Sequence, residues 1–108
     1  MKTILSYFVV FIGLTAGYAA FADQTADANT VEIKNYMFAP ATITVPAGTT
    51  VTWINRDQVP HTIVETNTLF RSAALDTDDK YTYKFDKAGT YKYFCTLHPQ
   101  MTATVVVK

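Results

Sequence analysis

Residues 88–101 have the sequence Ala-Gly-Thr-Tyr-Lys-Tyr-Phe-Cys-Thr-Leu-His-Pro-Gln-Met. Ala-Gly is typical of a turn, and the apolar residues that follow it recur at every second position, as in a half-buried β-strand. Cys95 shares the parity of Tyr91 and Tyr93, so its side chain is predicted to point toward the core. The predicted strand therefore ends in a buried thiol.

Three side chains of metal-binding type follow one another at the end of this strand. Cys95, His98 and Met101 occupy positions i, i+3 and i+6. Three residues of chain span at most about 10 Å, so a tight loop can bring all three side chains to one centre. A fourth ligand has to come from elsewhere, and His61, at the start of a predicted strand over 61–65, is the only other histidine in the chain. The sequence therefore predicts a metal site formed by His61, Cys95, His98 and Met101.

The donor atoms of this site favour copper. A thiolate and a thioether are soft ligands, and two His, one Cys and a weak axial Met form the ligand set of blue-copper electron-transfer sites. Zinc can occupy the same ligands, but a catalytic zinc normally keeps an open coordination position, and this set leaves none. We therefore expect one copper ion per chain, cycling between Cu(I) and Cu(II), in a protein that is not an enzyme and has no catalytic residues.

The rest of the chain after residue 22 has the composition of an all-β domain. It is rich in Val, Ile, Thr and aromatic residues, and period-two alternation recurs while helical periodicity is hard to find. Strands are predicted at 30–36, 41–45, 49–55, 61–65, 81–85, 91–95 and 102–107, with at most a short one at 70–74. About seven or eight short strands at this spacing, separated by turns, predict an antiparallel sandwich or barrel.

The first 22 residues are predicted to be a signal peptide. Lys2 supplies a positive charge, the following stretch is mostly apolar, and Ala20-Phe21-Ala22 fits the small-x-small cleavage rule. The alternative is an uncleaved membrane anchor, because the apolar stretch is just long enough to span a bilayer.

Cleavage after Ala22 would leave a short polar segment over 23–29, predicted to be flexible, and one domain over 30–108. Export would place the chain in an oxidising compartment, where a lone thiol is protected by burial or by a metal.

Composition excludes several other classes of function. The 108 residues suffice for one small domain. Nine Lys and Arg balance nine Asp and Glu, so there is no basic surface for nucleic acid. One cysteine cannot form a disulfide within the chain, and it falls short of the ligands of a closed structural zinc site.

Three segments resemble the cupredoxins, the family of type 1 blue copper proteins. Residues 95–101, Cys-Thr-Leu-His-Pro-Gln-Met, resemble the ligand loop of that family, and the two-residue gaps on either side of the histidine resemble those of amicyanin. Residues 51–61, Val-Thr-Trp-Ile-Asn-Arg-Asp-Gln-Val-Pro-His, resemble the strand and loop that carry the first histidine. Residues 88–93 resemble the strand before the cysteine. The resemblance covers 31–108 and extends to plastocyanin and pseudoazurin.

This resemblance implies a Greek-key β-sandwich and the role of a soluble, periplasmic one-electron carrier. His61, Cys95 and His98 would form a trigonal plane, with Met101 as the weak axial ligand. The implied partners are redox proteins, a donor dehydrogenase and/or a c-type cytochrome acceptor. The chain is expected to be a monomer that touches a membrane only through an uncleaved signal.

Two positions depart from the family pattern. Many cupredoxins have Asn after the first histidine, where it ties the two ligand loops together; here Thr62 has only a hydroxyl, which can replace part of an amide's hydrogen bonding. Gln100 stands where an amicyanin often has a bulky apolar residue.

His98 is the expected electron port. Its apolar surroundings are predicted to form a small docking patch for redox partners. The residues of this patch are Met37, Pro60, Leu97 and Pro99. The alternative is that the prolines only stiffen loops.

Two other functions compete with electron transfer. A copper-binding or copper-delivery protein would carry Met- or His-rich tracts and an open site. A thiol enzyme would use Cys95 as nucleophile and His98 as base, which requires an accessible thiolate.

Overall fold

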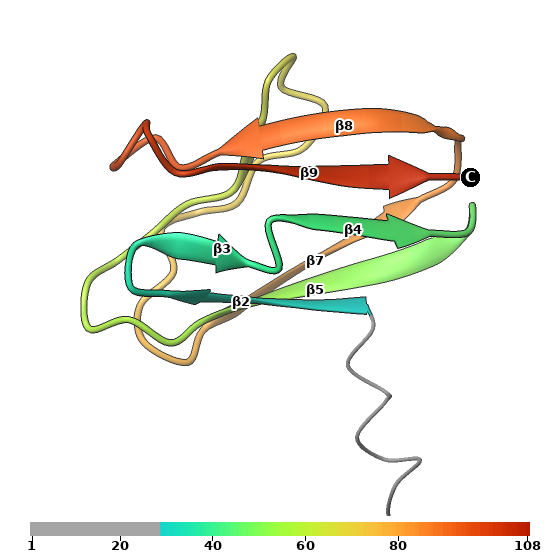
Figure 1. The fold of residues 1–108 in the computed structure, drawn as a ribbon. Coiled ribbons are helices and arrows are strands. Elements are labelled where there is room, and N and C mark those ends of the chain that lie inside the picture. Colours follow the sequence, from blue (N-terminus) through green and yellow to red (C-terminus); the bar gives the residue numbers. More distant parts are fainter. Residues whose placement is uncertain (1–28) are drawn as a thin grey trace, which may run out of the picture.

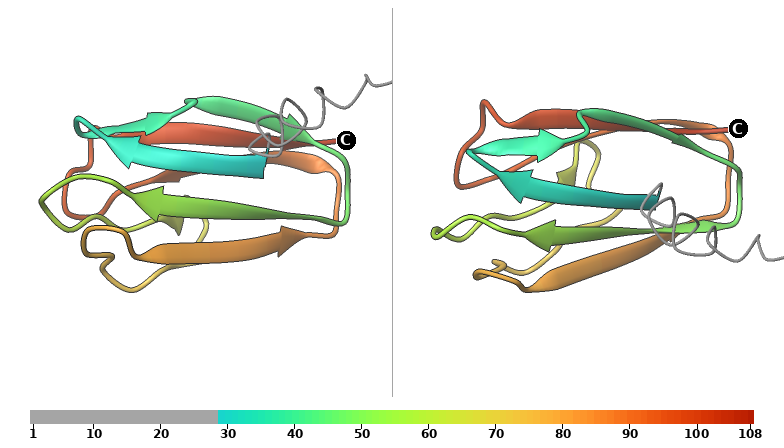
Figure 2. Two further views of the ribbon diagram at one scale, coloured as in Figure 1. Left: turned by 90° about the horizontal axis from the view of Figure 1, so that it is seen from below. Right: turned by 60° about the horizontal axis from the view of Figure 1, so that its bottom comes forward.

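A computed structural model of the chain describes residues 29–108, which form a sandwich of two four-stranded sheets (Figure 1). The sheets have the orders β3-β2-β5-β7 and β4-β9-β8-β6, and Figure 2 shows the first of them in front of the second. The predicted Greek-key β-sandwich is confirmed. Within 29–108 no helix is long and apolar enough to span a bilayer. The predicted signal peptide, its cleavage site and nearly all of the 23–29 segment lie outside the described residues.

Most strands lie where alternation predicts them. Their bounds are β2 (Thr30–Lys34), β3 (Met37–Ala39), β4 (Thr42–Val45), β5 (Thr49–Asn55), β6 (Val64–Glu65), β7 (Lys80–Phe85), β8 (Gly89–Phe94) and β9 (Thr102–Val107). The alternation is that of one core face and one solvent face: in β9, Ala103, Val105 and Val107 are buried and the residues between them are partly or fully exposed.

The pairing is mixed rather than purely antiparallel. Four of the six strand pairs are antiparallel, but β2 pairs with β5, and β4 with β9, in parallel. Parallel neighbours arise because the chain visits the other sheet between them: it passes through β4 before returning as β5 beside β2. This exchange between sheets brings segments that are distant in sequence to the same end of the sandwich.

The prediction of a strand over 61–65 was wrong in extent, and the 70–74 segment, for which at most a short strand is predicted, forms only a bridge. Only Val64 and Glu65 are in a strand, and the remaining pairing consists of isolated bridges, from His61 to Leu75 and from Val64 to Arg71. Side chains replace the regular ladder here, since the N–H of Ile63 donates to the Ser72 hydroxyl at 2.9 Å. His61 therefore lies in irregular chain and not in a strand.

The predicted strand over 30–36 breaks at a two-residue turn. Asn35 and Tyr36 connect β2 to β3 and have φ angles of 54° and 59°. Two consecutive left-handed residues are typical of a type I′ hairpin, in which the second position strongly favours Gly. A Tyr there costs about 1–2 kcal/mol.

Candidate metal centre

Three segments meet at one end of the sandwich; two of them carry the predicted ligands, and the third brings Tyr36 beside them (Figure 1). These are the turn between β2 and β3, the segment that follows β5, and the loop between β8 and β9. Each begins where a strand ends, so the sheets fix the points from which the side chains converge.

Cys95 lies between the two histidines. Its Sγ is 3.7 Å from Nδ1 of His61 and 3.8 Å from Nδ1 of His98, and the three ligand atoms lie within 4.8 Å of one another. With metal–sulfur and metal–nitrogen bonds of about 2.3 and 2.0 Å, S and N ligands of one ion lie at most about 4.3 Å apart. Cys95 is fully buried and unpaired. The two sulfur–nitrogen distances and the donor atoms suit a single soft metal ion.

Met101 returns the chain to the base of the same loop. Its N–H donates to the carbonyl of His98 at 2.9 Å, and the N–H of Cys95 donates to the Met101 carbonyl at 3.1 Å. The Met101 side chain is buried. The fourth predicted ligand is thus held in a loop that is closed by its own backbone.

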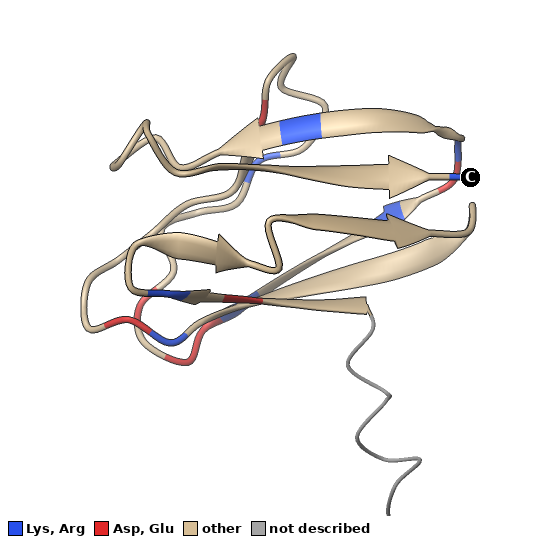
Figure 3. Ribbon diagram, in the orientation of Figure 1, with Lys and Arg blue, Asp and Glu red and all other residues tan. Residues whose placement is uncertain are grey.

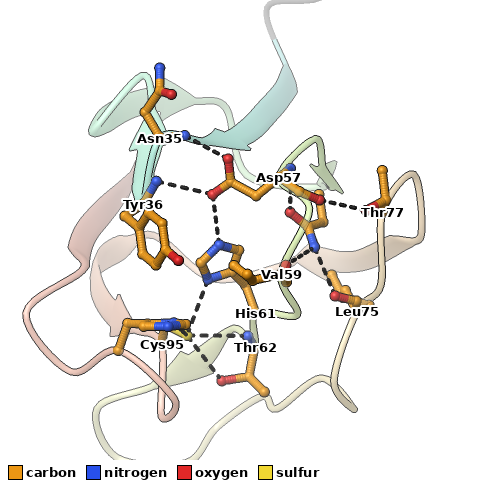
Figure 4. Close-up of polar contacts among 11 residues, drawn as sticks. Asn35, Tyr36, Asp57, Val59, His61, Thr62, Leu75, Thr77 and Cys95 are labelled. Carbon is orange, nitrogen blue, oxygen red and sulfur yellow. Dashed lines mark hydrogen bonds and ion pairs between the residues drawn. The ribbon is translucent and has the colours of Figure 1, made fainter.

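His61 is held from two sides. Its backbone exchanges two hydrogen bonds with Leu75, of 3.1 and 2.8 Å, and its fully buried ring places Nε2 2.8 Å from Oδ2 of Asp57 (Figure 4). A carboxylate at this distance favours the tautomer with the proton on Nε2. The lone pair of Nδ1 then faces the Cys95 sulfur.

Asp57 is a site residue that sequence reasoning missed. Its carboxylate accepts the N–H groups of Asn35 and Tyr36, at 2.7 and 3.0 Å, in addition to its contact with His61. Partial burial acts to raise the pKa of Asp57, but the hydrogen bonds from Tyr36, His61 and Asn35 outweigh it and lower that pKa below its ordinary value. The available signal was an acidic residue four positions before the histidine.

Asn55, the last residue of β5, positions this whole segment. Its buried side chain donates to the carbonyls of Val59 and Leu75, at 2.9 and 2.8 Å, and its Oδ1 accepts the N–H of Asp57 at 2.9 Å. One amide thereby fixes both Asp57 and the residue that pairs with His61.

Thr62 ties the two ligand segments together despite lacking an amide. Its Oγ1 accepts the N–H of Thr96 at 2.8 Å and lies 2.8 Å from the Thr96 hydroxyl. The N–H of Thr62 donates to Cys95 Sγ at 3.4 Å. Thr62 and Thr96 together therefore connect the two ligand segments, the role that Asn has in many cupredoxins.

The outer side of the site is apolar and uncharged. Met37 and Leu97 are 58% and 50% exposed, His98 is half-buried, and Pro60 and Pro99 are exposed. Segments 35–49, 58–64 and 93–107 contain no Lys, Arg, Asp or Glu, and Figure 3 shows the β8–β9 loop, β3 and β4 without charge. The four apolar residues predicted to form a patch around His98 are thus exposed, and so is Gln100.

Comparisons with known proteins agree with this arrangement. The sequence profile of the cupredoxin-like domain matches residues 4–107. Amicyanin from Paracoccus versutus is 36% identical over 94 residues, which cover 82% of this chain and 71% of that protein. Plastocyanin from Scenedesmus fuscus is 39% identical over 85 residues, which cover 67% and 87%. The solved structure of a purple cupredoxin from Nitrosopumilus maritimus superposes with a TM-score of 0.69 at 34% identity, covering 73% of this chain and 98% of that one.

Proposed function

The chain belongs to the cupredoxin family, and on this premise we propose that it is a one-electron carrier with a single type 1 copper site. The observation that carries the proposal is the buried Cys95 sulfur, within 3.8 Å of a ring nitrogen from each of the chain's two histidines. His61, Cys95, His98 and Met101 would hold the metal. When bound, copper supplies the Cu(I)/Cu(II) couple, which transfers one electron without breaking a bond.

The protein's own contribution is to keep the donor atoms in place. His61 and Cys95 are fully buried and Met101 nearly so, and each is tied to its neighbours by backbone hydrogen bonds. A site held in this way changes little between two oxidation states, which favours fast electron transfer. Hydrogen bonds to the sulfur, such as that from the N–H of Thr62, tune the potential.

Burial argues against the two competing functions. A thiol enzyme needs a thiolate that a substrate can reach, and Cys95 has no exposed surface. A copper-delivery protein needs an open site, whereas His98 is the only one of the four proposed ligands with more than a few per cent of its surface exposed.

The uncharged surface around His98 suits brief docking. Small apolar contacts are typical of transient redox complexes. The proposed partners are a donor dehydrogenase and/or a c-type cytochrome acceptor. The chain would meet them in the periplasm as a monomer, after cleavage of the signal peptide behind Ala22.

The optical spectrum of the copper-loaded protein tests the proposal. One equivalent of Cu(II) should give an intense absorption of red light from thiolate-to-copper charge transfer, and Cys95→Ser should abolish it. Met37→Leu, which changes an exposed methionine outside the proposed ligand set, should leave the band unchanged. A colourless wild-type complex with one bound Cu(II) would show that the assignment is wrong.

Repeated redox cycling separates a carrier from a delivery protein. A carrier should keep its copper through successive reduction by ascorbate and oxidation by ferricyanide in the presence of a Cu(I) chelator. Loss of the metal to the chelator in the first reduced state would favour delivery.

A further inference from the structure

The ring of Tyr36 contacts both histidines of the site. Its centroid lies 5.5 Å from that of His61 and 4.9 Å from that of His98, with interplanar angles of 90° and 89°. The two imidazole centroids are 4.9 Å apart. Three aromatic rings therefore form one cluster, and Tyr36, half exposed to solvent, is its outer member.

The backbone of Tyr36 is held in a conformation that its residue type disfavours. It is the second residue of the turn between β2 and β3, where a left-handed φ favours Gly. The N–H of Tyr36 donates to Oδ2 of Asp57, and the same oxygen contacts the His61 ring (Figure 4). One carboxylate oxygen thus fixes the turn and the histidine relative to each other. Strain that is kept in this way points to a use for the side chain.

We propose that Tyr36 is a positioning residue that fixes the imidazole planes of His61 and His98 and covers the metal site against small external ligands. The inference rests on the proposed function in taking these histidines as metal ligands. A perpendicular ring against each imidazole restricts rotation of both, because turning either ring about its Cβ–Cγ bond would bring it into the Tyr36 ring. His98 depends on this contact most, since it lies in a loop and is partly exposed.

The aromatic ring, and not the hydroxyl, carries the proposed role. Tyr36→Phe should therefore behave as the wild type. Tyr36→Gly removes the ring but suits the left-handed turn, so the variant should fold at least as well. Asn35→Gly is the matched control, because it changes the neighbouring residue of the same turn, which also has a left-handed φ.

Azide titration of the Cu(II) proteins, followed by absorption, tests the covering role. Tyr36→Gly should respond at azide concentrations at least tenfold below those that affect the wild type, Tyr36→Phe and Asn35→Gly. A ring that only stabilises the turn would shift the unfolding midpoint but not the azide response. Equal azide responses in Tyr36→Gly and Asn35→Gly would overturn the covering role.

NMR relaxation of the histidine ring carbons tests the positioning role, in both the metal-free and the Cu(I) protein. The His98 ring should show microsecond-to-millisecond exchange in Tyr36→Gly that is absent from the wild type and from Asn35→Gly. Unchanged ring dynamics in Tyr36→Gly would contradict it. If the wild type lacked the charge-transfer band, the copper function would fail, and the metal-free measurement would still decide whether Tyr36 fixes the rings.

Discussion

The two histidines of the site are held in different ways. His61 is fully buried, its backbone is bridged to Leu75, and its ring nitrogen meets the carboxylate of Asp57. His98 is partly exposed and belongs to a loop that is closed by hydrogen bonds among its own backbone groups. One proposed ligand is positioned by the sandwich, and the other by seven residues of loop.

This difference assigns separate roles to the two sides of the site. The side of His61 sets the geometry, because moving it would break buried hydrogen bonds. The side of His98 is the exposed one; under the proposed function it would face partners, and it is the side that can adjust when the charge of the site changes. The substitutions below distinguish the His61 side, which is held by the fold, from the His98 side, which is held by its loop, by their effects on stability and metal binding.

Replacing each histidine by glycine should give the largest contrast. His61→Gly leaves a buried cavity and removes one partner of the Asp57 carboxylate, so the metal-free protein should lose about 3 kcal/mol of unfolding free energy. His98→Gly should cost less than about 1 kcal/mol, because its site is partly exposed. Urea unfolding measures both, and equal losses would contradict the division.

Added imidazole provides a second test of the difference between His61→Gly and His98→Gly. It should restore the charge-transfer band of copper-loaded His98→Gly, whose cavity opens to solvent, and not that of His61→Gly.

Asp57→Asn should have the next largest effect, because it removes a hydrogen-bond partner of His61. Loss of an outer partner of a metal-binding histidine typically lowers metal affinity about 10–100-fold, and the lost charged hydrogen bonds should cost about 2 kcal/mol of stability at pH 7. The pKa of Asp57 is lowered on folding from the reference value of 3.8. Its contribution is therefore fully present above that reference value and is lost as pH falls through the lower folded value.

The pH series supplies the check on Asp57. The stability difference between wild-type and Asp57→Asn metal-free protein should be constant between about pH 7 and 5 and should shrink below the reference pKa. Asp86→Asn, an exposed residue beside Lys84, should show no such difference. A gap that persists at the lowest pH where the protein folds would contradict the role given to the charge.

Thr62→Val should have a smaller effect, because it cuts the connection between the two sides without opening a cavity. The Thr96 N–H loses its acceptor, which should cost about 1 kcal/mol, and the charge-transfer band should shift because the sulfur loses a nearby hydroxyl. Thr62→Ser should keep both properties. An unchanged stability in Thr62→Val would mean that Thr96 finds another partner.

Substitution of Met101 should change the potential with the least effect on the fold. Met101→Leu removes a donor that helps Cu(II) and should raise the potential, and Met101→Gln supplies a harder oxygen and should lower it. The Leu variant nearly conserves volume, so its stability should change by less than about 1.5 kcal/mol. Voltammetry that gives one potential for all three proteins would show that Met101 only fills the core.

The features that the sequence predicts well here are those set by residues close together in the chain. Alternation with a period of two predicted β5 and β9 over their full lengths, and the spacing of Cys95, His98 and Met101 predicted the loop. The role of Tyr36 depends on its contact with Asp57, 21 positions further along the chain, which no local pattern reveals. The irregular course after His61 was missed because a serine hydroxyl and a cysteine sulfur take the hydrogen bonds of a regular ladder there.

The backbone closure of residues 95–101 has a consequence for how such proteins diversify. β8 and β9 pair up to Phe94 and Thr102, and the N–H of Cys95 bonds to the carbonyl of Met101 directly beyond. The strands therefore need nothing from the residues in between to keep their register. A segment of this kind behaves as an exchangeable module: its length and composition can vary through evolution, and the properties of the bound ion with them, while the scaffold that carries it stays the same.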